Sequence, residues 1–307
     1  MRIFDTNVVF DDLTQPTEDS FWRGLRLHSH DEVAVENTSV TFSNINLENT
    51  QKVGLTGMKF YEFGSATVSD NEVTVDNVVI NSGSRSLVGA DFEVETIDSN
   101  RIVAQGNTLQ ILDSTFTDLD DVATVHSYQE GEALNAYMSG NELTLDQVTL
   151  TASNVERIDL LGACIEQSDE ESPQEDSSAT AKISGTWVDI KDVKVEKPDS
   201  INSSIWAAAV VQEYPDVQEA TVEFNVLSLE NTSGLNSIYS AAIYQEEGTD
   251  LQARVSSNQV MVRDNGTAKE SDFAEVFAVY IDQSSTKSNA ELLAEALDNV
   301  VTIESIS

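Results

Sequence analysis

Apolar and polar residues alternate with a period of two along almost the whole chain. In residues 71–82, two apolar pairs, Val73/Val75 and Val78/Ile80, flank a polar Asp-Asn dipeptide. Period-two alternation is typical of a strand with one buried face, and Asn and Asp are common in turns. This segment therefore predicts two short strands joined by a polar corner.

The first apolar pair of this segment recurs at steps of 33 to 45 residues. The copies are Val40/Phe42, Val73/Val75, Leu109/Ile111, Leu143/Leu145, Val188/Ile190, Val222/Phe224, Val260/Val262 and Val301/Ile303. A unit of this size cannot bury its apolar face alone, whereas stacked copies share one continuous core. The repeat predicts an all-β fold, a single-stranded right-handed parallel β-helix (β-solenoid) of about seven to eight coils.

A second apolar strand runs in step with the first. Its copies begin at Leu55, Leu87, Val122, Leu160, Ile205, Ile238 and Val276. Their fourth and sixth positions are mostly apolar, as an inward-facing surface requires. The fifth position is expected to face outward; it holds Lys59, Asp91, His126, Cys164, Ala209, Ala242 and Tyr280.

The eighth position of the second strand holds a glutamine in the last five copies. Side-chain amides stacked in register can hydrogen-bond to one another along a ladder. We therefore expect a structural ladder rather than a binding site, formed by Gln129, Gln167, Gln212, Gln245 and Gln283.

A third motif places an alanine five residues before an asparagine. Its copies are Ala66/Asn71, Ala136/Asn141 and Ala253/Asn258. Asn tolerates the left-handed backbone conformation and bonds to its own turn. We expect these asparagines to adopt that conformation at a corner repeated in each coil.

The repeat covers the whole chain, so we expect one β-helix domain over residues 1–307. Residues 1–15 predict a partial coil, and the acidic run 168–178 predicts a loop at one corner. Residues 284–307 predict a short capping helix or an unfinished coil. An unfinished coil would expose parallel strand edges, so we expect the natural chain to continue into further coils.

Charge limits the partners. The chain has 54 acidic and 16 basic residues and a net charge of −38. Such a surface repels nucleic acid and anionic membranes, so we expect no nucleic-acid partner and no direct membrane insertion. The single cysteine, Cys164, excludes an intramolecular disulfide. The N-terminus has no basic region followed by an apolar one, so no signal peptide is visible.

Gly-Ala strands followed by A-x-V-x-x-N-x-V-x-V and N-V-x-L form a repeat style whose clearest copy is MSGNELTLDQVTLTAS, residues 138–153. This style resembles the passenger region of bacterial autotransporters (type V secretion). The resemblance implies a non-enzymatic adhesin or display segment that is extracellular or on the bacterial outer-membrane surface. Its partner would be a host or bacterial surface protein or a glycan, and an outer-membrane barrel would follow it. The family supplies no catalytic or cofactor-binding residues, so none is expected.

Two other functions stay open. A carbohydrate-active β-helix (polysaccharide lyase, hydrolase or tailspike-like protein) needs two carboxylates across a sugar. Adjacent acids occur at Asp11/Asp12 and within 118–121, but neither group has a nearby histidine or Arg-x-Lys motif in sequence. We therefore expect these acids on a solvated surface. A purely structural stalk is the other alternative, and it predicts no ligand.

Metal and nucleophile candidates are weak. The acidic loop could hold calcium loosely through Asp169, Glu170, Glu171, Glu175 and Asp176. His28 and His30 alternate on one strand as a transition-metal pair, although exposed histidines are commoner there.

The cysteine and the tryptophans have simple structural interpretations. We expect Cys164 to be a packed small residue rather than a nucleophile, since no histidine is close in sequence. Trp22, Trp187 and Trp206 are expected in the core or at a cap, except that the strand register turns Trp187 outward.

Overall fold

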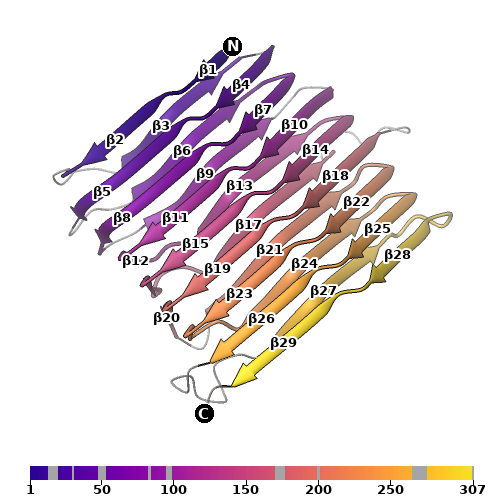
Figure 1. Cartoon of the computed structure of the whole chain (residues 1–307). Helices are drawn as coiled ribbons and strands as arrows, with labels where there is room; N and C mark the ends of the chain where they lie inside the picture. The colour runs from indigo at the N-terminus through magenta and orange to yellow at the C-terminus, as the bar shows by residue number, and fades with distance from the viewer. Residues whose placement is uncertain are drawn as a thin grey trace.

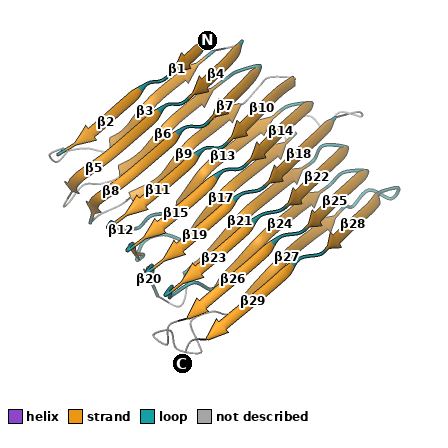
Figure 2. Cartoon of the chain, viewed as in Figure 1, coloured by secondary structure: helices purple, strands orange, loops and turns teal. Residues whose placement is uncertain are grey.

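The computed structural model describes residues 1–12, 20–29, 31–47, 53–81, 84–94, 99–169, 177–198, 201–264 and 275–305. Every regular element in these ranges is a β-strand (Figure 2), so they contain no helix that could cross a membrane. The capping helix predicted within 284–307 is therefore wrong, because residues 291–297 and 300–305 are strands.

The strands wind through three parallel sheets and return to the first sheet after each turn (Figure 1). Sheet A contains β1 (Arg2–Phe4), β4 (Glu32–Glu36), β7 (Ser65–Ser69), β10 (Ser99–Gln105), β14 (Ala133–Ser139), β18 (Ser178–Ser184), β22 (Val217–Glu223), β25 (Asp250–Ser256) and β28 (Glu291–Leu297). Sheet B contains β2 (Asn7–Asp11), β5 (Ser39–Leu47), β8 (Glu72–Ile80), β11 (Thr108–Leu112), β12 (Thr115–Thr117), β15 (Glu142–Asp146), β16 (Thr149–Thr151), β19 (Trp187–Lys191), β20 (Lys194–Glu196), β23 (Val226–Glu230), β26 (Gln259–Asp264) and β29 (Val300–Ser305). Sheet C contains β3 (Ser20–His28), β6 (Val53–Tyr61), β9 (Ser84–Val94), β13 (Asp121–Glu130), β17 (Arg157–Ser168), β21 (Asn202–Glu213), β24 (Ser237–Glu246) and β27 (Glu275–Ser284).

The predicted β-solenoid is confirmed, with about seven turns. Equivalent repeat positions pair directly from coil to coil, as in Val40 with Val73 and Leu109 with Leu143. The inward residues of all three sheets form one core that runs along the molecule, and Phe60 stacks on Phe92 within it with ring centroids 4.6 Å apart. Stacking therefore supplies the burial that a single coil cannot.

The five glutamines at the eighth position form a continuous ladder, buried except at Gln283. Four amide nitrogens donate to the amide oxygen of the preceding coil: Gln167 to Gln129, Gln212 to Gln167, Gln245 to Gln212 and Gln283 to Gln245, at 2.7–2.8 Å. The amides also donate to backbone carbonyls of sheet A, as Gln245 does to Gln218 O. The ladder thus joins sheets A and C and is fully used within the fold.

The asparagines of the third motif form a second ladder, but not in the expected conformation. Asn71 donates to Asn107 Oδ1 at 2.9 Å and accepts from the backbone N–H of Thr38 at 2.8 Å. The left-handed residue is the one before each asparagine, Asp70 (φ 54°) in one coil and Gly106 (φ 62°) in the next. The prediction is wrong because the sharp turn precedes the asparagine, whose side chain then points into the corner between coils.

Candidate functional site

The strands of sheet C change direction at one column of small residues. Pairing between β17 and β21 includes Leu161 with Trp206 and Ala163 with Ala208 but skips Gly162. A Cβ on Gly162 would lie 2.4 Å from the carbonyl oxygen of Ala207 and 2.6 Å from Val188 Cγ2 of sheet B. This close approach excludes larger side chains on the inner side. On the outer side, residues from both halves of the strand line a groove of about 570 Å³.

The outer groove, as we call it, crosses β6, β9, β13, β17, β21 and β24 and concentrates charged residues. Its acids are Asp91, Glu93, Asp121, Asp159, Glu166, Glu213 and Glu246, and its basic residues are Lys59, His126 and Arg157. These residues lie far apart in sequence and meet because parallel coils place equivalent columns side by side. The fifth position of the second repeated strand, which holds Lys59, Asp91 and His126 in three successive coils, therefore faces outward, as predicted.

His126 lies at the centre of a hydrogen-bonded cluster. Its Nδ1 is 3.2 Å from Asp91 Oδ1, and its Nε2 is 3.5 Å from Glu166 Oε1. Burial alone would lower the pKa of His126, but the bonds to Asp91 and Glu166 outweigh burial and raise this pKa to about 10. Asp91 also pairs with Lys59. The imidazole is therefore held as a cation between two carboxylates.

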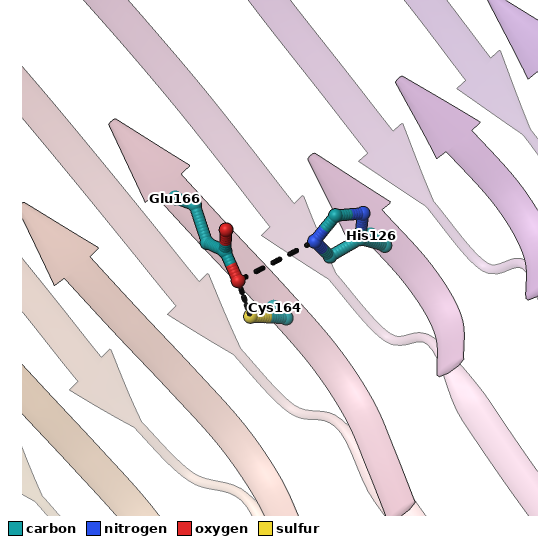
Figure 3. Close-up of side chains that lie close together, drawn as sticks. All are labelled: His126, Cys164 and Glu166. Carbon is teal, nitrogen blue, oxygen red and sulfur yellow. Dashed lines mark hydrogen bonds and ion pairs between the residues drawn. The ribbon is translucent and has the colours of Figure 1, made fainter. Parts of the chain in front are cut away.

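Cys164 lies directly beside His126 on the neighbouring strand (Figure 3). Its Sγ is 3.9 Å from Glu166 Oε1, and the side chain is buried although it lies on the outer face. Burial, with Glu166 as the next cause, raises the pKa of the thiol well above its usual range. The expectation of a packed residue holds. No histidine is close to Cys164 in sequence, but the pairing of β13 with β17 places His126 beside it.

Asp121 and Asp159 form a carboxyl pair on neighbouring strands. The two residues are in register between β13 and β17. Burial and the nearby charge of Asp159 raise the pKa of Asp121 to about 6. Burial also raises the pKa of Asp159, while Arg157, whose Nε is 3.0 Å from Asp159 Oδ2, and hydrogen bonds from Ser204 and Trp206 oppose the rise. Burial thus raises the pKa of both carboxyl groups, and Arg157 opposes the rise in both.

A row of stacked aromatic rings continues from this pair along the solenoid. Trp206 stacks on Tyr239 with centroids 4.2 Å apart, and Tyr239 stacks on Phe277 at 5.2 Å. Trp206 and Tyr244 line the outer groove. The prediction that Trp206 lies in the core or at a cap is therefore wrong, because its side chain lies on the outer face of β21 and lines the outer groove. Trp187 is 45% exposed on sheet B, as the register indicated.

The other sequence candidates do not converge on a site. Asp118 accepts hydrogen bonds from the backbone N–H groups of Ser153 and Asn154 and so holds a turn. Asp11 lies on β2 and accepts hydrogen bonds from Ser43 and Asn44.

Two of the metal candidates of the sequence, His28 and Asp169, lie within the described residues. His28 pairs with Glu62 at 2.8 Å. Asp169 is buried. The remaining proposed calcium ligands, Glu170, Glu171, Glu175 and Asp176, and the second histidine of the proposed pair, His30, lie outside the described residues.

Sequence reasoning missed the outer groove because it searched for catalytic groups close together along the chain. Asp121 was set aside for want of a nearby histidine, yet it shares the groove with His126. The aligned columns carried the needed signal, since His126 and Cys164 are consecutive members of one column.

Comparison of the chain with protein-family models, with curated proteins and with solved structures finds no match. The geometry of the outer groove is therefore the basis for the function proposed below.

Proposed function

We propose that the protein binds a neutral glycan in the outer groove and hydrolyses a glycosidic bond there with Asp121 and Asp159. The observation that carries this proposal is the in-register carboxyl pair beside the aromatic row. Glycoside hydrolysis uses one protonated and one ionised carboxyl group at the scissile bond. Two neighbouring carboxyl groups with raised pKa values can hold one proton between them, so that one is protonated while the other is ionised.

The two carboxyl groups have distinct roles in this mechanism. Asp121, with its pKa of about 6, donates its proton to the glycosidic oxygen as the bond to the anomeric carbon breaks. Asp159, in which Arg157 and the hydrogen bonds from Ser204 and Trp206 oppose the burial-driven rise in pKa, takes a proton from the water that adds to that carbon. The products are two chains ending in hydroxyl groups, and the released proton restores the acid form of the pair.

The lining favours a neutral sugar over a polyuronate. Acids outnumber basic residues seven to three, counting the groove residues named above. Such a field repels anionic polymers, whereas carboxylates accept hydrogen bonds from sugar hydroxyls. The flat face of Trp206 offers an apolar surface for the C–H face of a sugar ring. Hydrolysis therefore suits this groove better than the elimination that uronate lyases perform.

The adhesin or display interpretation shares the first half of this proposal. A passenger-like surface protein that recognises a glycan would use the same groove without cleaving the bound chain. Its extracellular location and host or bacterial partner are likewise proposals. A structural stalk differs from both, because it needs no ligand.

The test is release of reducing ends from a panel of neutral and acidic polysaccharides. We expect activity on a neutral polymer that falls as the pH rises through about 6, because Asp121 then loses its proton. Asp121→Asn and Asp159→Asn should each lower the rate at least about a hundredfold. Asp189→Asn on sheet B, outside the groove, is the matched control and should keep wild-type activity.

Two results decide between the alternatives. Glycan binding without released ends would replace hydrolysis with the adhesin function. Absence of both binding and cleavage across the panel would contradict the proposal and leave the stalk.

A further inference from the structure

We propose that His126, Cys164 and Glu166 form a binding site for a zinc ion, with Asp91 positioning the histidine. This site is separate from the Asp121–Asp159 pair and does not depend on glycan binding. Its three ligands lie on β13 and β17, and Asp91 on β9 holds the histidine.

The three ligand atoms already point toward one another (Figure 3). His126 Nε2, Cys164 Sγ and a carboxylate oxygen of Glu166 all lie within 4.8 Å of one another, and Glu166 Oε1 is 3.5 Å from the imidazole and 3.9 Å from the sulfur. Tetrahedral zinc with bonds of about 2.0–2.3 Å holds its ligand atoms about 3.3–3.6 Å apart. Small side-chain rotations therefore bring the set to coordination distance.

The histidine is oriented as metal-bound histidines are. A ligating imidazole donates its other N–H to a carboxylate or carbonyl, which fixes the ring orientation. Asp91 Oδ1 accepts from His126 Nδ1 at 3.2 Å, and this leaves Nε2 facing Glu166 and Cys164. Lys59 in turn binds Asp91. The second layer of a metal site is thus present around the ring.

The donor set selects the ion. Thiolate and imidazole ligands favour zinc and related transition metals, whereas calcium and magnesium prefer oxygen ligands alone. All three residues line the outer groove, so a fourth coordination position would face the groove and accept water or a sugar oxygen.

Charge at the cluster is conserved when the ion enters. Before binding, the imidazolium and the Glu166 carboxylate cancel, and the thiol is neutral. Zinc brings two positive charges, the thiol and the imidazolium each release one proton to solvent, and the thiolate and carboxylate then balance the ion. The exchange places no net charge in the groove.

The experiment is titration of the chelator-treated full chain with Co²⁺ and then Zn²⁺ in constant salt. We expect one Co²⁺ per chain with a thiolate-to-cobalt charge-transfer absorption, which one equivalent of Zn²⁺ removes. The chain has a single cysteine, so such a band can arise only from Cys164. Exposed acids that bind cations give no such band.

Variants test the roles of the individual residues. Cys164→Ser should abolish the band, and Asp91→Asn should weaken zinc binding about ten- to a hundredfold. His28→Asn is the matched control, because His28 pairs with Glu62 away from the cluster, and it should bind as wild type does.

A wild-type titration without the charge-transfer band overturns the proposal, even where a variant fails to fold. Equal zinc affinity in wild type, Cys164→Ser and Asp91→Asn also overturns it, because the ion would then be bound by surface acids.

Discussion

Gln212 illustrates what a single ladder residue does in this fold. Its Nε2 donates to Gln167 Oε1 at 2.8 Å, and its Oε1 accepts from Gln245 Nε2 at 2.7 Å. The side chain is fully buried. A buried amide that loses its partner keeps the full cost of having been removed from water. One substitution therefore affects three coils.

We predict that Gln212→Leu lowers the free energy of unfolding by about 2–4 kcal/mol, because it removes the donor to Gln167 Oε1 and one acceptor of Gln245 Nε2 inside the core. Gln252→Leu, at an exposed position of β25, should cost less than about 0.5 kcal/mol. Urea unfolding of both variants measures the difference. An equal loss of unfolding free energy in the two variants would contradict the stabilising role of the ladder hydrogen bonds.

Asp121 predicts a pH dependence of stability. Its pKa in the folded protein is about 6, above its ordinary value of 3.8, so folding favours its protonated form. The stability that this group contributes is therefore complete below about pH 4 and is lost as the pH rises through about 6. Facing charges on Asp159, Arg157, His126 and Asp120 enter this balance.

We predict that wild type loses up to about 3 kcal/mol more than Asp121→Asn between pH 4 and pH 7, from a shift of about two pKa units. Urea midpoints of both proteins at matched pH values measure this difference, in which acids distant from Asp121 cancel. Parallel pH profiles would show that the Asp121 pKa is not raised.

At the scale of elements, the bend in each sheet C strand decides where a groove can form. Gly162 touches the backbone of Ala207 and side chains of sheet B, so the strand approaches the next sheet with no room for a Cβ. The outer half-strands on either side of the bend then contribute to one hollow surface. The groove thus depends on one column of small residues.

We predict that Gly162→Ala lowers the free energy of unfolding by about 1–3 kcal/mol through overpacking and disturbs the groove. Ala207→Gly, in the same column of the next coil, adds no atom and should cost only about 1 kcal/mol. Urea unfolding compares the stabilities, and near-ultraviolet circular dichroism reports on Trp206. Wild-type stability of Gly162→Ala would contradict the packing described for the bend.

The strands themselves could be predicted from the sequence, because buried apolar residues recur at equivalent positions in each coil. The pairs beginning at Val73 and Leu109 are paired in the structure as they are aligned in sequence. The conformation of the asparagine corner was harder to predict from the sequence, since the same turn uses Asp70 in one coil and Gly106 in another. Backbone geometry at a corner depends on neighbouring coils, which a local motif does not contain.

At the scale of the whole molecule, sites form between coils rather than within segments. His126 and Cys164 are 38 residues apart and lie side by side. Asking whether a histidine is close in sequence therefore missed both the cluster and the carboxyl pair. Side-chain directions and the depth of the groove follow from the strand bend, which requires three-dimensional packing to recognise.

The net charge of −38 gives a prediction for the whole molecule. Like charges repel most strongly in the folded chain, and salt screens them over about 10 Å at 0.1 M and about 3 Å at 1 M. We predict that the melting temperature rises by several degrees between 0.05 M and 1 M NaCl. A melting temperature that is constant or falls over this range would show that repulsion between surface acids does not limit stability.

Two tryptophans provide the most direct test of the outer groove as the functional site. Trp206 lies in the groove, whereas Trp187 is exposed on sheet B. The measurement is binding of the wild type, Trp206→Ala and Trp187→Ala to an array of neutral and acidic glycans, with circular dichroism to verify folding. We predict that wild type and Trp187→Ala bind the same neutral glycan and that folded Trp206→Ala binds it at least about tenfold more weakly. Binding that is lost in Trp187→Ala and kept in Trp206→Ala, or no glycan bound by the wild type, would contradict this account.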